Sequence, residues 1–573
     1  MIKQLPTALF GLCVSLAPMT FAAPSYTCGN MRFEVMDYNS RTLKFCGVEN
    51  SYADSVLIIP TTINVDDSGF GREEDDYDGN PLGKWFIKEL GRVYTPSNVI
   101  SITVPEGITE INGFSSRLKE LKLPSTLKSI NHSALINQYN LRKLELPQNL
   151  EYIGGFAFSD CSSLEEINIP SKVKEIPIGA FHQCRSLKHV SFPDGLTNIG
   201  EQAFYYCSNL SEIELPDSLK SIQSAAFLRA GLQSIKVSDG VSEIPSHAFS
   251  ECYKLTSIEL PVRLKRIGDE AFFDTSIESI ELPETLESIG TGVFNCCRKL
   301  QSVAIPESVS TLGAYMFYGC DNLSEVKLPS NITEIGDYMF FSCGLSEIEI
   351  PNKVEVIGRR AFSDNGRIIG PFTKIILPDS LKYIGEGAFE ECIFLTEMVI
   401  PDKVTTIGFG AFIGCSVLEK IKLGRELQRI DDKAFLNCNY IRYVECNGET
   451  PPDMGYKVFS EHIYDDATLV VPDNAKDDYA DFNCWKDFFD VKTKSEVDDE
   501  FGPVPNINID SDGISIFGEG GRIRVNGADG QFMHVYNLSG TCVYSGDCET
   551  TSYIGKGIYV VKIGNNHYKV YIR

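Results

Sequence analysis

The chain has 573 residues, of which 43% are hydrophobic and 11% aromatic, and this composition is that of a folded protein. Its formal net charge of −26 argues against a nucleic-acid-binding function, because phosphates require a basic face. The same charge disfavours electrostatic adsorption to anionic lipid.

The first 22 residues have the organisation of an export signal. Lys3 supplies the positive end, Leu5–Leu16 is a short apolar run, and residues 20–22 (T-F-A) suit a cleavage site. Cys13 would allow lipoprotein processing, but Leu12 before it is too large for that signal, so we expect none. The apolar run is shorter than the ~20 residues of a membrane span, and we expect no transmembrane segment elsewhere.

Residues 23–95 have no fixed period and are predicted to form an N-terminal β cap. Met31–Val35 and Thr42–Val48 alternate like the strands of a hairpin, and Val56–Pro60 follows as a further strand. The acidic stretch 73–78 (E-E-D-D-Y-D) is either a calcium-binding or a solvated loop, and we prefer the solvated loop.

Residues 96–450 repeat with a fixed period. Five successive prolines stand 23 residues apart: Pro124, Pro147, Pro170, Pro193 and Pro216. The series continues to Pro401, with Ser238 in place of one proline, and Gly424 takes the next position. A period near 23 is typical of a solenoid, in which each repeat stacks on its neighbours. Such a surface usually binds a partner rather than catalysing a reaction.

One repeat shows how the solenoid is built. Ile213 and Leu215 alternate with Glu212 and Glu214, which predicts a short strand with one buried face, closed by Pro216. The apolar residues that follow are not spaced for a helix and predict an irregular or 3₁₀ return. The expected fold is therefore a solenoid with a parallel sheet on one face.

The repeat resembles the BspA-type leucine-rich repeat, whose pattern is I-G-x-x-A-F-x-x-C-x-x-L-x-x-I-x-L-P. Matching Ala-Phe pairs stand at Ala157-Phe158, Ala180-Phe181, Ala203-Phe204, Ala271-Phe272, Ala388-Phe389 and Ala411-Phe412. The resemblance implies a leucine-rich-repeat solenoid with an extracellular or cell-surface location. It also implies binding to proteins or host surfaces, chiefly in anaerobic bacteria of the mouth and gut.

A few repeats depart from the period. Those near Arg229, Ser276 and Gly344 are one residue short, and the repeat between Pro351 and Pro378 has 27 residues. The longer repeat predicts a bulge at 364–367 (D-N-G-R), which is either a contact loop or tolerated surface variation.

Residues 451–491 are predicted to close the solenoid. Ala467–Pro472 is expected to be its last strand, covered by a helix that carries Tyr479, Trp485 and Phe488. A charged linker is predicted over 492–506.

Residues 507–573 are predicted to form a small β-sandwich. The expected strands are Ile514–Phe517, Arg522–Val525, Met533–Asn537, Gly557–Ile563 and Tyr568–Ile572. Val535–Gly540 and Gly555–Ile563 resemble the C-terminal sorting domain of the type IX secretion system. That resemblance implies either passage across the outer membrane with surface attachment or a retained Ig-like module.

Asn508-x-Asp510-x-Asp512-Gly513, with Glu519 in the twelfth position, nearly fits a calcium-binding EF-hand loop. Strand-like alternation follows it and no helix pattern flanks it, so we do not expect calcium there.

Eighteen cysteines are present, of which Cys13 lies in the predicted signal. Ten share one phase of the repeat: Cys161, Cys184, Cys207, Cys252, Cys297, Cys320, Cys343, Cys392, Cys415 and Cys438. We interpret these as small buried core residues in preference to disulfides between repeats. Outside that phase, Cys28–Cys46 and Cys542–Cys548 are candidate disulfides. No Cys-x-x-Cys pair supports a zinc site.

No catalytic motif is present and the seven histidines are scattered, so we expect neither an enzyme nor a cofactor. The sequence favours a secreted or surface-displayed protein that binds extracellular proteins or glycoproteins. The alternative is a structural or carbohydrate-capturing component of the bacterial surface. The exposed strand face has no aromatic residue, which disfavours sugar capture there. The candidate binding residues on that face are Glu325, Lys327, Glu347, Glu349, Lys374, Ile376, Glu397 and Val399.

Overall fold

The computed structural model describes residues 25–28, 30–37, 41–65, 83–115, 117–365 and 372–497, and seven strands between residues 508 and 572. The chain divides into two compact units, residues 1–218 and 219–573, each described by itself. The predicted signal peptide and the acidic stretch 73–78 lie outside the described residues. None of the helices in the described ranges has both the length and the apolar character needed to cross a membrane.

Unit 1 begins with a five-stranded sheet in the order β1-β2-β3-β6-β5. The strands are β1 (Ser25–Cys28), β2 (Met31–Asp37), β3 (Thr42–Val48), β5 (Thr62–Val65) and β6 (Gly83–Tyr94). The predicted antiparallel pairing of β2 with β3 is confirmed. Sequence periodicity missed the 12-residue β6 because its register against β3 shifts twice, so that Ile87, Leu90 and Val93 are buried at intervals of three.

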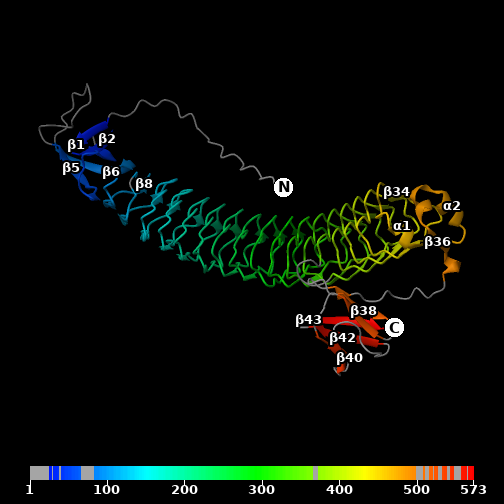
Figure 1. The fold of residues 1–573 in the computed structure, drawn as a ribbon. Helices are drawn as coiled ribbons and strands as arrows, with labels where there is room; N and C mark the ends of the chain where they lie inside the picture. Colours follow the sequence, from blue (N-terminus) through cyan, green and yellow to red (C-terminus); the bar gives the residue numbers. More distant parts are fainter. Residues whose placement is uncertain are drawn as a thin grey trace. The chain divides into compact units, whose positions relative to one another are not determined.

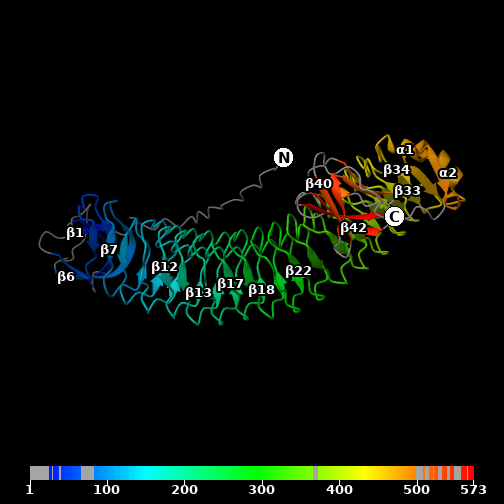
Figure 2. The same ribbon diagram turned by 60° about the horizontal axis from the view of Figure 1, so that its bottom comes forward.

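The repeats of unit 1 contain two columns of parallel strands, whereas the sequence predicted one (Figures 1 and 2). The predicted strand near Val56 opens the first column: β4 (Val56–Ile58), β7 (Ser101–Thr103), β9 (Glu120–Lys122), β12 (Glu166–Asn168) and β14 (His189–Ser191). The second column has two-residue strands: β8 (Glu110–Ile111), β10 (Ser129–Ile130), β11 (Tyr152–Ile153), β13 (Glu175–Ile176) and β15 (Asn198–Ile199). Neighbours pair in register, as Ile167 with Val190 and Ile176 with Ile199.

The repeat that contains Ile213 and Leu215 is an exception. Residues 211–216 form no strand, so the prediction is wrong at that place. Its assignment of faces is right, because Ile213 is buried, Leu215 is half-buried, and Glu212 and Glu214 are exposed. Strand assignment requires a paired neighbour as well as alternation, and alternation is all that a sequence shows.

Unit 2 repeats the same arrangement. Its first column holds β17 (Ser234–Lys236), β19 (Ser257–Glu259), β22 (Ser302–Ala304), β23 (Glu325–Lys327), β25 (Glu347–Glu349), β27 (Lys374–Ile376), β29 (Glu397–Val399), β31 (Lys420–Leu423) and β33 (Tyr443–Cys446). Its second column holds β16 (Ser221–Ile222), β18 (Glu243–Ile244), β20 (Arg266–Ile267), β21 (Ser288–Ile289), β24 (Glu334–Ile335), β26 (Val356–Ile357), β28 (Tyr383–Ile384), β30 (Thr406–Ile407), β32 (Arg429–Ile430) and β34 (Asp453–Met454). The predicted solenoid with a 23-residue period is confirmed.

The return between the columns contains no 3₁₀ helix in the described repeat residues, so of the two predicted alternatives the irregular return is the one present. Most returns instead place two residues in the left-handed region, one just before the Ala-Phe pair and one four residues later. Phe156 (φ 55°) and Asp160 (φ 60°) are one such pair. Their N–H groups donate to the carbonyls of Ile178 (2.9 Å) and His182 (2.7 Å) in the next repeat, so the return has its own hydrogen-bonded ladder.

Phenylalanines form the centre of the core. Phe158 and Phe181 stack with ring centroids 5.1 Å apart, and Phe181 stacks on Phe204 at 5.3 Å. In unit 2 the stack runs from Phe227 through one ring per repeat to Phe459. All of these rings are at most 2% exposed. Their regular spacing keeps every repeat in the same phase.

The ten phase-locked cysteines are buried and unbonded, as predicted. Each thiol donates a hydrogen bond to a backbone carbonyl of the preceding repeat, in most repeats that of the stacked core phenylalanine. Examples are Cys184 to Phe158 O (3.1 Å) and Cys320 to Phe294 O (3.0 Å). Asn365, 0% exposed, takes the cysteine position in the longer repeat and donates to Phe340 O (2.7 Å). The predicted bulge at 364–367 therefore does not include Asn365, while 366 and 367 lie outside the described residues.

The end of the solenoid in unit 2 is longer than predicted. β35 (Thr468–Val471) confirms the expected strand, and β36 (Asp490–Thr493) adds one more in parallel. The aromatic residues do not share one helix: Tyr479 lies in α2 (Lys476–Asp481), Trp485 in the 3₁₀ helix η1 (Asn483–Asp487), and Phe488 directly after η1. The short α1 (Ile463–Asp466) precedes them. A second 3₁₀ helix, η2 (Lys494–Glu496), begins with a capping box formed by Thr493 and Glu496. Residues 492–496 are therefore folded and do not belong to a linker.

The last residues form two antiparallel sheets, ordered β37-β38-β39 and β41-β40-β42-β43, as a small sandwich requires. The predicted strands are present: β38 (Ser515–Glu519), β39 (Arg522–Asn526), β40 (Phe532–Asn537), β42 (Gly557–Ile563) and β43 (Asn566–Ile572). β37 (Asn508–Ile509) and β41 (Cys542–Asp547) were not predicted. Because β37 pairs antiparallel with β38, strands and not EF-hand helices flank that acidic motif, whose Asp510 and Asp512 are outside the described residues.

We expect the ten core thiols to resist modification in the folded protein. Burial raises the pKa of Cys161, Cys252 and Cys297 to about 12, so the reactive thiolate is scarce as well as inaccessible. Mass mapping after labelling should find these thiols unmodified in the native protein and modified only after denaturation. A bridge between successive repeats, such as Cys184 to Cys207, would show the core interpretation to be wrong.

The left-handed returns predict opposite effects for glycine at two adjacent alanines. Ala225 has a φ of 56°, whereas its buried neighbour Ala226 is not left-handed. A left-handed non-glycine residue costs roughly 1–2 kcal/mol, which exceeds the added entropy loss of glycine. Ala225→Gly should stabilise unit 2 by about 1 kcal/mol, and Ala226→Gly should destabilise it by about 1–2 kcal/mol. The midpoints of urea unfolding measure both; a loss of stability in Ala225→Gly would contradict the argument.

Candidate binding surfaces

The eight candidate residues on β23, β25, β27 and β29 form what we call the strand-face patch. Each strand points its middle residue inward and its two outer residues to solvent. Ile376 is 66% exposed and Val399 is 47% exposed, while Met398 between the outer residues of β29 is 1% exposed. The structure therefore brings the predicted residues onto one side of successive repeats.

The patch is not one uninterrupted hydrogen-bonded sheet. β25 pairs with β27, which sets Glu347 opposite Lys374 and Glu349 opposite Ile376. β23 pairs with β22 instead, and β29 pairs with β31. The patch is thus contributed by three neighbouring ladders.

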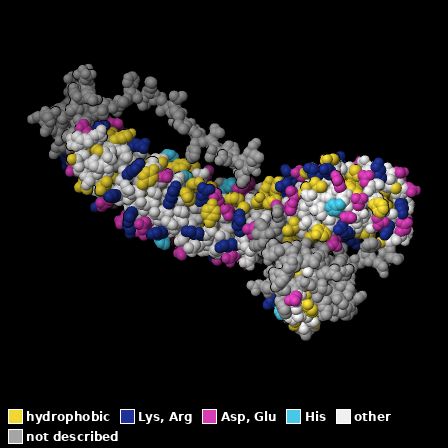
Figure 3. Space-filling model, viewed as in Figure 1, with side chains coloured by type: hydrophobic (Ala, Val, Ile, Leu, Met, Phe, Trp, Pro, Cys, Tyr) yellow, Lys and Arg dark blue, Asp and Glu magenta, His cyan; other side chains and the backbone are white. Residues whose placement is uncertain are grey.

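The six charged side chains of the strand-face patch make no ion pair within 4 Å to any described residue. Elsewhere on the first column such pairs occur, as Lys236–Glu259 (3.7 Å) and Lys422–Glu445 (3.1 Å). Figure 3 shows Lys or Arg and Asp or Glu side chains interspersed over the visible face. Charged side chains of both signs are therefore mixed on this face, although the net charge of the chain is −26. The charged side chains of the patch remain able to pair with those of a partner.

The two candidate disulfides stay predictions. Cys46 is a half-buried free thiol, whose pKa burial raises to about 11, and Cys542 is exposed and free. The side chain of Cys28 and all of Cys548 lie outside the described residues.

Aromatic residues missing from the strand face occur on the return. Tyr315 stacks on Tyr338 with centroids 4.9 Å apart, and Tyr318 stacks on Phe341 at 4.7 Å. Tyr315 is 38% exposed, and the Arg359 guanidinium lies 5.9 Å from the Tyr338 ring centre. A signal for this cluster was available in the sequence, because aromatic residues recur on both sides of the Met-Phe pairs Met316-Phe317 and Met339-Phe340.

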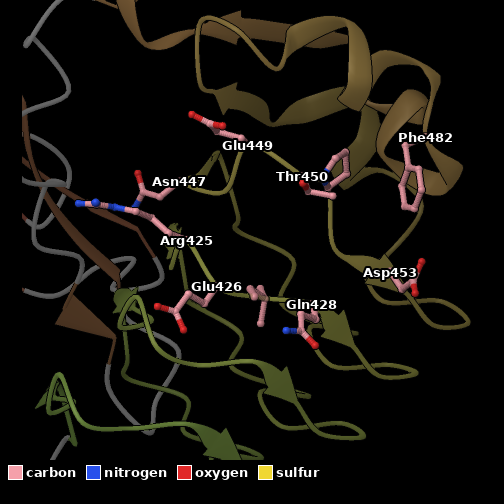
Figure 4. Close-up of a pocket in the computed structure, with 10 residues that line it drawn as sticks. Arg425, Glu426, Gln428, Asn447, Glu449, Thr450, Asp453 and Phe482 are labelled. Atoms are coloured by element: carbon pink, nitrogen blue, oxygen red, sulfur yellow. The ribbon is translucent and has the colours of Figure 1, made fainter.

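A cleft of about 820 Å³ lies near the end of the repeats and was not predicted (Figure 4). One wall is the segment between β31 and β32, the other is the segment between β33 and β34, and Phe482 closes one side. The lining residues are Arg425, Glu426, Leu427, Gln428, Asn447, Glu449, Thr450, Pro451, Asp453 and Phe482.

An inserted residue opens this cleft. Lys420 pairs with Tyr443 and Ile430 pairs with Met454, so nine residues on one side face ten on the other. The extra residue must bulge. Within the described chain, backbone hydrogen bonds to the preceding repeat are made by Asn447 and Asp453 but by no residue between them.

Two carbonyls of the bulged segment instead accept hydrogen bonds from side chains of α2 and η1. The Tyr479 hydroxyl donates to Gly448 O (3.0 Å), and the Trp485 indole donates to Pro452 O (2.8 Å). Both donors are at most 1% exposed. Two buried aromatic side chains thus hold the cleft wall in place.

No group of three or more His, Cys, Asp or Glu side chains in the described ranges is placed to hold a metal ion. The carboxylates of Glu426, Glu449 and Asp453 are therefore spread around the cleft and do not converge on one point.

The stacked parallel strands, the phenylalanine column and the repeated returns define a leucine-rich-repeat solenoid protein. The model of the BspA type leucine rich repeat region matches residues 92–207, 128–256, 174–286, 242–369 and 370–476. These overlapping matches cover more than half of the chain, which therefore belongs to the BspA-type leucine-rich repeat family. Proteins of this family are typically cell-surface proteins with binding or structural roles and no enzymatic activity.

Two solved structures illustrate the similarity. A leucine-rich repeat protein from Bacteroides ovatus is 24% identical with a TM-score of 0.49, over 75% of this chain and 99% of that one. A leucine rich cell surface protein from Faecalibacterium prausnitzii is 21% identical with a TM-score of 0.38, over 74% of this chain and 94% of that one. A search among curated proteins gave no match.

Proposed function

We propose that this chain is a secreted or surface-displayed protein that binds extracellular proteins or glycoproteins, in adhesion or host interaction, through its strand-face patch. The observation that carries the proposal is the combination of exposed Ile376 and Val399 with charges that have no ion-pair partner among the described residues. Protein interfaces combine an apolar centre with a polar rim in this way.

The fold does not require these side chains. The inward residues of each repeat hold the core, and the outward residues of β25, β27 and β29 contact solvent. Exposed apolar residues are common singly, but two on successive repeats of a rigid scaffold give a partner a pre-ordered apolar strip. Binding there would order few side chains and cost little conformational entropy.

Export and surface attachment belong to the same proposal. The predicted signal peptide over 1–22 would direct export, and residues 507–573, which resemble the type IX sorting domain, would serve passage and attachment. The proposed intervening parts are 23–95 and 96–450, then a C-terminal cap from 451 that extends to 496 and a linker that ends at 506.

Substituting the apolar pair tests the patch. Ile376→Glu with Val399→Glu should leave the thermal midpoint unchanged, because both side chains point to solvent. It should weaken binding to a partner isolated with the mature protein by about tenfold or more, the effect of losing a central contact. Surface plasmon resonance of the purified pair measures this.

Val262→Glu is the matched control, because Val262 is 65% exposed and lies off the strand face. Glu347→Lys and Lys374→Glu change the charge of the patch in opposite directions, so they should change the rate of association with a charged partner, and its salt dependence, in opposite directions. Unchanged binding in both the apolar double variant and the charge reversals would place the partner elsewhere.

A further inference from the structure

The cleft between the β31–β32 and β33–β34 segments carries polar side chains that the fold leaves unused. Glu426, Gln428, Glu449 and Thr450 make no side-chain hydrogen bond or ion pair to any described residue. By contrast, Arg425 pairs with Asp402 (3.2 Å), and Asn447 accepts a hydrogen bond from Lys494 through its Oδ1. The Asn447 amide N–H₂ is then left to donate to a ligand.

The lining mixes hydrogen-bond donors with acceptors. Amides and hydroxyls both donate and accept, and carboxylates accept two bonds from neighbouring donors. In Figure 4 the labelled side chains surround an open space from both segments, with Glu449 on one side and Glu426 and Gln428 on the other. Such dispersed groups match a molecule that carries hydroxyls around its whole perimeter.

Phe482 supplies an apolar surface in this polar setting. Its ring is half-buried, lines the cleft, and has no aromatic partner among the described residues. A pyranose ring presents hydroxyls at its edge and C–H groups on its face, so one aromatic ring and a set of planar polar groups satisfy both. The volume of about 820 Å³ is within the usual range of small-molecule sites.

Other ligand classes fit less well. An anion would meet three carboxylates and one arginine that is already paired with Asp402. The carboxylates do not converge on a metal, as described above. An apolar ligand would bury the amide, hydroxyl and carboxylate groups without hydrogen bonds, which is costly. A neutral polyhydroxylated ligand avoids all three penalties.

We propose that this cleft binds a neutral hexopyranose unit, with Phe482 stacking on the sugar face and Gln428, Glu426, Glu449 and Asn447 bonding its hydroxyls. The wall is fixed before binding by Tyr479 and Trp485, so little ordering accompanies binding. This site is separate from the strand-face patch, and neither proposal depends on the other.

Saturation-transfer NMR on the full mature chain tests the proposal. The probes are the methyl glycosides of glucose, galactose, mannose and N-acetylglucosamine, with N-acetylneuraminic acid as an anionic probe and trilysine as a cationic one. At least one neutral glycoside should show saturation transfer to its ring protons. Phe482→Ala and Gln428→Ala should each weaken that affinity by about three- to tenfold, and together by more.

The matched controls are Phe489→Ala, a ring that is 85% exposed outside the cleft, and Gln301→Ala on an earlier repeat. Both should bind the glycoside like the unchanged protein, and all variants should keep the same thermal midpoint. The proposal is overturned if no neutral glycoside shows transfer, or if transfer survives Phe482→Ala with Gln428→Ala. Selective binding of trilysine or N-acetylneuraminic acid would overturn it in favour of a charged ligand.

Discussion

Nearly every repeat must reverse direction and return to the same phase within 22 or 23 residues, and the rest of the structure depends on how it does so. The return has no helix to guide it, so the direction is set by two left-handed residues per repeat, mostly not glycine. Each costs roughly 1–2 kcal/mol. The cost is offset because the same residues donate to the next repeat and because the return places a phenylalanine and a cysteine inside. Stacked rings then fix the spacing, and the thiol adds a second hydrogen bond to a buried carbonyl: Phe158 O accepts from both the Cys161 backbone N–H and the Cys184 thiol.

This arrangement explains which features the sequence could reveal. Alternation at Glu397-Met398-Val399 predicted an inward and two outward residues, and the recurrent cysteine predicted a small buried residue. Both signals are repeated many times and depend only on local geometry. The second strand column was missed because two residues cannot show a period. β6 was missed because its irregular register breaks the alternation.

The candidate sites divide in the same way. The strand-face patch could be found because its residues occupy fixed phases of the repeat, although nothing in the sequence revealed that the ladder is interrupted between β27 and β29. The cleft could not be found, since it depends on one extra residue measured against the neighbouring repeat and on Phe482, a residue of the cap. The available signal was a difference in length between two neighbouring repeats. The segment from Tyr443 to Met454 is one residue longer than the segment from Lys420 to Ile430 that pairs with it.

The left-handed positions also show where the fold tolerates substitution. Gly292 and Gly387 occupy the position two residues before the core phenylalanine, while Tyr315 (φ 58°) and Tyr338 (φ 54°) occupy it in two adjacent repeats. A bulky residue is disfavoured there, and stacking of the two rings at 4.9 Å returns about 0.5–1.5 kcal/mol, which offsets part of the backbone cost of the two residues. Phe156 (φ 55°) occupies the same position without an aromatic counterpart and contacts His132 and His182 edge-on instead. Outward side chains on the return can thus contact their counterparts in the neighbouring repeat without entering the core. The residues at these positions differ from repeat to repeat while the inward residues, and hence the fold, stay the same, which leaves the outward surface able to carry a binding site.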